Sequence, residues 1–217
     1  PAGAVADEHI VAAYDDPAAL DRLIATCDVV TTEFENPPAE ALDVLATSVQ
    51  VAPAPAAVRI AQDRIAEKLF LVSSGFPVGD HVVLDPANGS IEQVPVDLAD
   101  RGVVIKTARL GYDGKGQVLL NQYEDLEPAW QALGQSDLIL EAFVPFNAEC
   151  SLIAVRAKSG DVRYWPLTRN VHANGVLLLS QPGVLPTGLQ AEAEGIVSKL
   201  LRHWQYVGVL AVEFFVV

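Results

Sequence analysis

The chain has 217 residues, a length typical of one or two domains with a sizeable core. Hydrophobic residues make up 51% and charged residues 19%, which excludes a disordered or collagen-like protein. The 14 Lys and Arg residues stand against 28 Asp and Glu residues, and the net charge of −14 disfavours binding to nucleic acid or to an anionic membrane. No apolar run approaches the roughly 20 residues of a membrane-spanning helix, so we expect a soluble protein.

The two cysteines, Cys27 and Cys150, lie far apart, and neither has a partner at the spacing of a metal site or a redox motif. We interpret both as core thiols of a protein from a reducing compartment. No export signal is recognisable, so we expect a cytoplasmic location. The chain contains no Met, opens with Pro1 and closes on the apolar run Phe214–Val217, and we therefore interpret it as part of a longer polypeptide.

The first sixty residues alternate apolar runs with helical patterns, which is typical of βα units with a parallel sheet. Asp16 should cap a helix that opens at Pro17, and a second helix should begin at Pro37 and Pro38 and continue through Leu45. The expected strands are Val11–Ala13, Asp28–Glu33 and Val49–Val51.

An Ala/Pro linker, Ala52–Ala57, is expected to lead into one helix over Val58–Ser73. Further helices are expected near Leu126–Leu133 and over Gln190–Trp204. The expected strands are Phe76–Leu84, Val103–Lys106, Gln117–Leu120, Leu138–Phe143, Cys150–Arg156, Val162–Asn170, Val176–Leu179 and Val207–Val217. This organisation predicts a truncated parallel α/β domain over residues 1–62, a lid-like α+β subdomain over residues 63–145 and an incomplete lobe over residues 146–217.

A glycine-rich loop within residues 103–117 carries the most chemical information. An apolar run ends at Lys106, and the loop after it contains three glycines together with Tyr112, Asp113 and Lys115. Glycines let backbone amides approach an anion closely and the lysines add positive charge, so a polyphosphate is a suitable ligand. The glycine spacing fits neither a Walker A loop nor a Rossmann fingerprint. From spacing alone, a glycine-rich hairpin with a solvated lysine is an equally good interpretation.

Three further motifs accompany the loop GYDGKGQ at Gly111–Gln117. They are QDRIAEK at Gln62–Lys68, PLTRNVHANGVL at Pro166–Leu177 and YVGVLAVEFF at Tyr206–Phe215. With these four motifs in this order, the chain resembles the N5-carboxyaminoimidazole ribonucleotide synthetases, a family of ATP-grasp enzymes of purine biosynthesis. The resemblance covers the whole chain and implies an ATP-grasp fold preceded by a truncated Rossmann-like parallel α/β domain. Members of the family also carry a GQLGRM-type turn before this region and an N-E-x-A-P-R-x-H-N-S-G-H segment after it.

The resemblance implies a nucleotide site. Arg64 and Lys106 would contact the phosphates, the loop would close over the γ-phosphate, the backbone of Glu141–Val144 would meet the adenine edge, and Glu149 would accept from the ribose hydroxyls. The full set of implied nucleotide-binding residues is Arg64, Lys106, Gly111, Tyr112, Asp113, Gly114, Lys115, Gly116, Gln117, Glu141, Ala142, Phe143, Val144, Glu149 and His172. The candidate catalytic residues are Lys106, Tyr112, Asp113 and Lys115. Glu213 matches the first of two carboxylates that hold Mg²⁺, and the second belongs to the N-E segment outside this chain.

The implied reaction is the ATP-dependent carboxylation of 5-aminoimidazole ribonucleotide with bicarbonate. Bicarbonate is a poor electrophile, so the family first phosphorylates it to carboxyphosphate. No covalent enzyme intermediate is needed, which agrees with the absence of a Ser/His/Asp or Cys/His constellation in the sequence. The resemblance also implies a homodimer.

Several of these residues have simpler interpretations. Arg64 could be an exposed helix residue paired with Asp63 or Glu67, Glu149 could be an edge-strand charge, and His172 could be a turn residue.

Glu213 lies between Val212 and Phe214 in an apolar strand, so we expect it to be buried beside a cation or paired with a lysine. Glu33 and Glu35 follow a predicted strand and could either line a substrate cleft or cap the next helix.

Two other functions compete with the carboxylase. One is a related ATP-grasp ligase such as the formate-dependent glycinamide ribonucleotide transformylase, whose substrate residues would differ in the segment beyond this chain. The other is a catalytically silent nucleotide-binding domain that serves as an assembly partner. Lys106, the complete GYDGKGQ loop and Glu213 argue against the silent domain.

Overall fold

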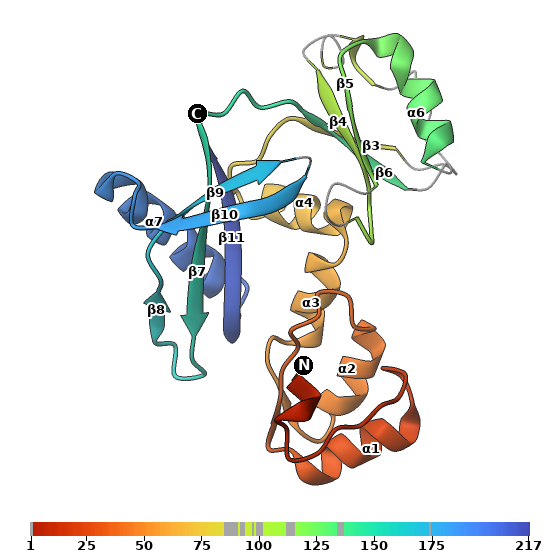
Figure 1. Cartoon of the computed structure of the whole chain (residues 1–217), viewed down its shortest axis with the longest axis vertical. Helices are drawn as coiled ribbons and strands as arrows, with labels where there is room; N and C mark the ends of the chain where they lie inside the picture. The colour runs from red at the N-terminus through yellow and green to blue at the C-terminus, as the bar shows by residue number, and fades with distance from the viewer. Residues whose placement is uncertain are drawn as a thin grey trace.

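The computed structural model describes residues 2–84, 91, 94–96, 98, 102–111, 116–133, 137–173 and 175–217. Figure 1 shows a small N-terminal unit at one end of the molecule and two β-sheets at the other, with the small sheet on the right and the large sheet on the left. Within the described ranges, no helix has both the length and the apolar character needed to cross a bilayer.

The N-terminal unit contains a two-stranded parallel sheet, as the βα pattern predicts. Strand β1 (Val29–Val30) pairs with β2 (Gln50–Val51), and the flanking helices are α1 (Pro17–Thr26) and α2 (Ala39–Ala46), after a short 3₁₀ turn at Ala2–Ala4. The Asp16 carboxylate caps α1 by accepting from the Ala19 amide at 2.9 Å. The strand expected at Val11–Ala13 is wrong, because this segment has no strand pairing and the Val11 side chain is exposed to solvent.

The single helix expected over Val58–Ser73 is in fact two helices, α3 (Pro55–Ala61) and α4 (Arg64–Ser73). The break occurs at Asp63, whose backbone is extended and whose carboxylate accepts from the amides of Ile65 and Ala66 at 3.0 and 3.1 Å. An Asp side chain that satisfies the first free amides favours a new helix start over continuation of the previous helix. The expected linker is also shorter than predicted, because α3 begins at Pro55.

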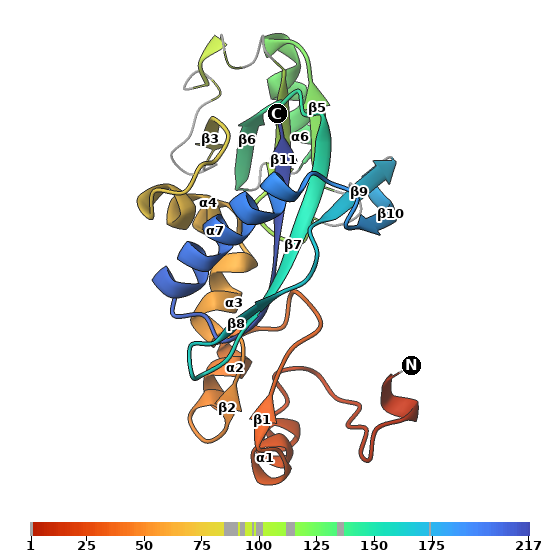
Figure 2. The same cartoon turned by 90° about the vertical axis from the view of Figure 1, so that its left-hand side faces the viewer.

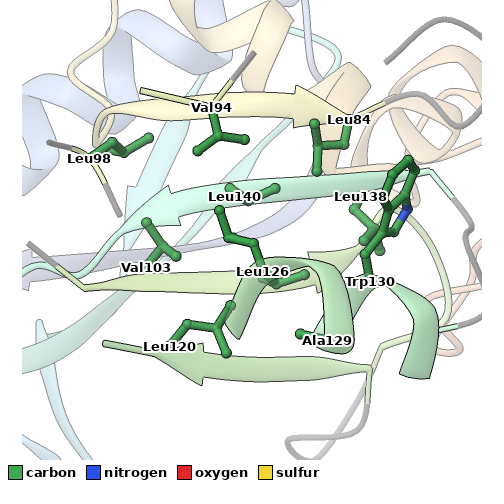
Figure 3. Packing of buried hydrophobic residues seen from close by; sticks show 11 residues of the cluster. Leu84, Val94, Leu98, Val103, Leu120, Leu126, Ala129, Trp130, Leu138 and Leu140 are labelled. Atoms are coloured by element: carbon green, nitrogen blue, oxygen red, sulfur yellow. The ribbon is translucent and has the colours of Figure 1, made fainter. Parts of the chain in front are cut away.

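The small sheet is antiparallel, with the strand order β3 (His81–Leu84), β6 (Leu138–Ala142), β4 (Val103–Thr107) and β5 (Gln117–Leu120). Helix α6 (Leu126–Ala132) follows a 3₁₀ turn at Tyr123–Asp125 and covers one face. Figure 3 shows how Leu126 and Trp130 of this helix pack onto Leu138 and Leu140 of β6. Each fully buried leucine contributes on the order of 2 kcal/mol, so this cluster holds the central strands in a fixed position.

The large sheet has the order β10 (Val176–Pro182), β9 (Thr168–Ala173), β7 (Ala148–Arg156) and β11 (Gly208–Val216), with β8 (Val162–Tyr164) paired to β7. Helix α7 (Thr187–His203) lies along β7 and β11 in both views (Figures 1 and 2), where Val197 and Leu201 are buried with Leu152 of β7. The strand expected over Val162–Asn170 is divided into β8 and β9 around Pro166, which cannot donate a ladder hydrogen bond.

Two connections join the units around the sheets. The rings of Phe70 in α4 and Trp204 after α7 lie 4.8 Å apart, and Ser74 Oγ and His203 Nε2 form a hydrogen bond of 3.0 Å. The segment 143–147 crosses from β6 to β7. Its first amide, that of Phe143, donates to Gly102 of the small-sheet unit at 2.8 Å, and its last amide, that of Asn147, donates to Val216 of the large sheet at 2.7 Å. This crossing segment is therefore fixed at both ends.

Candidate functional site

A cluster of three charged side chains lies where α4 meets the small sheet. Glu141 of β6 binds the Lys68 ammonium of α4 through Oε1 and the Lys106 ammonium of β4 through Oε2. Only 16%, 18% and 24% of the Lys68, Glu141 and Lys106 side chains are exposed. Burial alone would raise the pKa of Glu141, but the Lys106 and Lys68 ammonium groups outweigh burial and lower the pKa to about 2. The carboxylate is therefore ionised. Glu67 and Arg64 of α4 also interact electrostatically with this cluster, so three cations stand against two carboxylates and the net charge is positive.

Arg64 holds the chain segment that leads into the glycine-rich loop. Its guanidinium donates to the carbonyl oxygens of Thr107 and Gly111, both at 3.0 Å, and its backbone amide donates to Ala108 at 2.9 Å. The interpretation of Arg64 as an exposed partner of Asp63 is wrong, because the Asp63 carboxylate instead binds Arg109 Nε at 3.0 Å. The contact of Arg64 with nucleotide phosphates stays a prediction.

The glycine-rich loop connects two paired strands. Lys106 lies opposite Gln117 in the β4–β5 register, and the Thr107 amide donates to Gly116 at 2.8 Å. Gly116 has φ +71°, and a Cβ at this position would lie 2.6 Å from Thr107 Oγ1, so both backbone conformation and space require glycine. From the sequence, a hairpin and a phosphate loop were equally good interpretations. Strands β4 and β5 pair as in a hairpin, and the phosphate loop stays a prediction. The predicted residues Tyr112, Asp113, Gly114 and Lys115 lie outside the described residues.

The predicted adenine-binding segment forms the start of the crossing between the sheets. The amides of Ala142 and Phe143 already donate to Asp80 and Gly102, at 2.9 and 2.8 Å. The Val144 amide, in contrast, bonds to none of the described residues, while the Val144 carbonyl accepts from Phe146 at 2.9 Å. Among these three neighbouring amides, Val144 therefore offers the donor that a ring nitrogen of a purine could use.

A polar ladder crosses one face of the large sheet. His172 Nδ1 of β9 and Glu149 Oε2 of β7 form a hydrogen bond, and the buried Asn170 donates to Ser151 Oγ at 3.0 Å and accepts from Ser180 Oγ at 3.1 Å. Two of the simpler interpretations are wrong. Glu149 does not lie on an edge strand, because β7 lies between β9 and β11, and His172 lies within β9 and not in a turn.

The expected burial of Glu213 is wrong. Side chains alternate along β11, so that Val212 and Phe214 pack in the core beneath α7 while Glu213 lies exposed on the opposite face, across from Ser151 of β7. No described group of three or more His, Cys, Asp or Glu side chains could hold a metal ion. Magnesium commonly uses one or two protein carboxylates together with phosphate oxygens and water, so a single accessible carboxylate fits the ion as one ligand of an incomplete site.

The N-terminal unit contains a separate pocket of about 490 Å³ that Glu33 lines and Glu35 does not. Cys27 also lines this pocket and is only half-buried, so the core-thiol prediction holds for Cys150 alone. Neither carboxylate caps α2, because the cap position is Pro38 and no side chain hydrogen-bonds to it. The capping alternative is therefore wrong.

Sequence reasoning missed Lys68 and Asn170. In the sequence, Lys68 resembles any lysine on the polar face of a helix. Its ion pair with Glu141 is visible only in the folded structure. Asn170 lies next to Val171 in a strand pattern, and a buried amide there signals hydrogen-bond partners on both neighbouring strands.

A profile of the ATP-grasp domain matches residues 69–217, which contain both sheets and helix α7. The chain belongs to the ATP-grasp family. A profile of the ribonucleotide synthetase preATP-grasp domain matches residues 1–62. The predicted fold class, an ATP-grasp fold preceded by a parallel α/β unit, is thereby confirmed.

Among curated relatives, the N5-carboxyaminoimidazole ribonucleotide synthase of Brucella melitensis is 44% identical over 219 residues, which cover 100% of this chain and 60% of that protein. A crystal structure of an N5-carboxyaminoimidazole ribonucleotide synthetase in complex with ADP is 34% identical with a TM-score of 0.89, covering 98% of this chain and 56% of that chain. The Aspergillus clavatus synthase in complex with ADP and 5-aminoimidazole ribonucleotide is 25% identical with a TM-score of 0.84, covering 99% and 57%. The resemblance found in the four motifs is confirmed, and this ATP-grasp chain spans 60% or less of these relatives.

Proposed function

We propose that the protein containing this chain is an ATP-dependent ligase that carboxylates 5-aminoimidazole ribonucleotide with bicarbonate to N5-carboxyaminoimidazole ribonucleotide. The observation that supports the nucleotide part is the convergence of Lys68 and Lys106 at the base of the β4–β5 glycine hairpin. The assignment of the substrate is supported by two relatives of this name at 44% identity and by the relative whose structure holds ADP and 5-aminoimidazole ribonucleotide.

Residues of both sheets would bind ATP. The Lys106 ammonium would neutralise the α- and β-phosphates, and the free Val144 amide would donate to the adenine edge. Glu149, oriented by His172, would accept from the ribose hydroxyls. Arg64 would act on the phosphates by holding the carbonyls of Thr107 and Gly111 and thereby the entrance of the glycine loop, in addition to any direct contact.

The proposed reaction transfers the terminal phosphoryl group of ATP to a bicarbonate oxygen, which gives ADP and carboxyphosphate. The amine of the ribonucleotide then forms a bond to the carbon of carboxyphosphate, or of the carbon dioxide released from it, while phosphate departs and the amine loses a proton. The chain's own residues would place the reactants and neutralise charge, because phosphoryl transfer needs little covalent participation by the protein. The glycine loop would exclude water, which protects the labile intermediate.

Magnesium, when bound, would neutralise charge on the transferred phosphoryl group. Glu213 would contribute one oxygen ligand to it from the accessible face of β11. Of the predicted catalytic residues, Lys106 lies in the charged cluster, whereas Tyr112, Asp113 and Lys115 are proposed from the resemblance alone. The homodimer stays a prediction of the resemblance, and the cytoplasmic location stays a prediction from the sequence.

The test is a phosphate-release assay on the full-length protein with ATP, Mg²⁺ and bicarbonate, with and without 5-aminoimidazole ribonucleotide. We expect release that increases when the ribonucleotide is added, together with formation of the carboxylated product. Release that instead depends on glycinamide ribonucleotide and formate would favour the transformylase. No nucleotide-dependent release under any condition would favour the silent assembly domain.

A further inference from the structure

Lys68 is the least exposed member of the charged cluster, and the proposed reaction gives it no contact with a reactant. We infer that Lys68 is a positioning residue for the nucleotide phosphates: by binding one oxygen of Glu141, it keeps the Lys106 ammonium incompletely neutralised and available to an anion. This inference rests on the proposed function, because it deepens the account of the same phosphate site.

The Glu141 carboxylate shares its two oxygens between the two lysines. Lys68 binds Oε1 and Lys106 binds Oε2, so each oxygen serves one ammonium. A carboxylate has enough lone pairs to bind one cation with both oxygens. Without Lys68, both oxygens of Glu141 would be available to Lys106, and the pair would be neutral. With Lys68 present, the cluster keeps one excess positive charge in a half-buried place where charge is weakly screened.

The helix that carries Lys68 is held in place near both of its ends. Helix α4 is capped by Asp63 at its start and its Phe70 ring packs on Trp204 near its end. Lys68 follows Arg64 by four residues, so both cations lie on one face of the helix. The same face therefore orients Lys106 through Glu141 and holds the start of the glycine loop through Arg64.

A purely structural ion cluster is the competing explanation, and it predicts different measurements. Both explanations predict some loss of stability in a neutral variant, but a purely structural role would also weaken all ligands of the site together. A positioning role acts on the phosphates alone, because only they interact with the excess charge. It also requires a positive charge at position 68, which Arg could supply and Met or Gln could not.

The experiment uses the full-length protein and measures the dissociation constants of ATP and adenosine by calorimetry and the KM for ATP. For Lys68→Met we expect ATP binding to weaken on the order of tenfold, with a matching rise in KM and little change in kcat. Adenosine binding should stay the same. Lys68→Arg should retain most of the ATP affinity, and Lys68→Gln gives a second neutral variant in case the Met variant does not fold.

Glu141→Gln in the Lys68→Met background supplies the decisive double variant. It removes the carboxylate that would neutralise Lys106, so ATP affinity should recover toward that of the parent. Lys199→Met serves as the control, since Lys199 is exposed on α7 and forms no ion pair with a described residue. If the parent binds ATP and both Lys68→Met and Lys68→Gln bind it equally well, the inference is overturned and the proposed function is not. Equal weakening of ATP and adenosine would also overturn it in favour of the structural role. A parent that binds no ATP would overturn the proposed function together with the inference.

Discussion

Glu149 and His172 are hydrogen-bonded across strands β7 and β9, and both side chains lie on the face of the large sheet that α7 does not cover. Asn170, Ser151 and Ser180 continue the polar contacts along this face. A carboxylate whose direction is set by a histidine on the next strand presents its second oxygen in a defined place. A carboxylate held in this way could accept hydrogen bonds from the hydroxyls of a ribose in a fixed position.

Glu149→Gln should weaken ATP binding in the full-length protein on the order of tenfold, because a charged acceptor for the ribose is lost. The same change should reduce the preference for ATP over 2′,3′-dideoxy-ATP, since the analogue never uses the carboxylate. Titration of both nucleotides against both proteins measures this. Asp161→Asn, a change on the exposed turn before β8, serves as the control. An unchanged preference in the Glu149 variant would show that Glu149 does not contact the ribose.

Much of the fold could be predicted from local pattern. The apolar stripe of α7 and the apolar run of β11 give the positions of these two elements within a few residues. The prediction of one helix over Val58–Ser73 failed because a single side chain, that of Asp63, starts a new helix. Asp63 could have been recognised as a helix cap, and the helix break with it, since an Asp before an apolar run is a start signal.

The candidate site was predicted less completely, for a physical reason. Both faces of β11 carry apolar residues, so the alternation did not reveal that Glu213 shares the open face with Phe215 and not the core face with Phe214. The Lys68–Glu141 contact joins a helix to a strand distant in sequence, and no local pattern reports such a pair. The family resemblance predicted which residues act on the nucleotide, whereas the contacts between those residues became visible only in the fold.

Gly116→Ala should destabilise the protein by more than the strain of its backbone alone. At φ +71° an L-residue costs about 1–2 kcal/mol, and the added Cβ would also meet Thr107 Oγ1 at 2.6 Å. Gly183→Ala is a matched control, because Gly183 has φ +70° and nothing within 4 Å of the added Cβ. Urea unfolding of the two variants should give a larger loss for Gly116. Equal losses would mean that Thr107 moves aside without cost.

Acid should remove the contribution of Glu141 to stability. The folded-state pKa of about 2 lies below the ordinary value of 4.5, so the carboxylate stabilises the folded state above pH 4.5 and loses this effect as the pH falls toward 2. The full effect is on the order of 3 kcal/mol. The difference in free energy of unfolding between the parent and Glu141→Gln should therefore be large at pH 7 and shrink below pH 4.5.

Glu124→Gln provides the comparison for that series, since Glu124 is exposed and forms no ion pair with a described residue. Its stability difference from the parent should be small at every pH. A Glu141→Gln difference that stays constant from pH 7 to pH 3 would contradict the ion cluster described above.

The most direct measurement is ATP binding and turnover by the full-length Lys106→Ala protein. Lys106 lies next to the buried Ile105, but its own ammonium binds only Glu141 among the described residues, so the fold should persist. Loss of a charge-assisted phosphate contact of about 1.5–3 kcal/mol predicts a tenfold to hundredfold loss in affinity, with turnover reduced as well. Lys106→Arg should recover only part of this, because a planar fork does not replace a compact ammonium. Lys158→Ala, on the exposed turn after β7, should bind and turn over ATP like the parent. If Lys106→Ala also binds and turns over ATP like the parent, the phosphate site does not lie at Lys106.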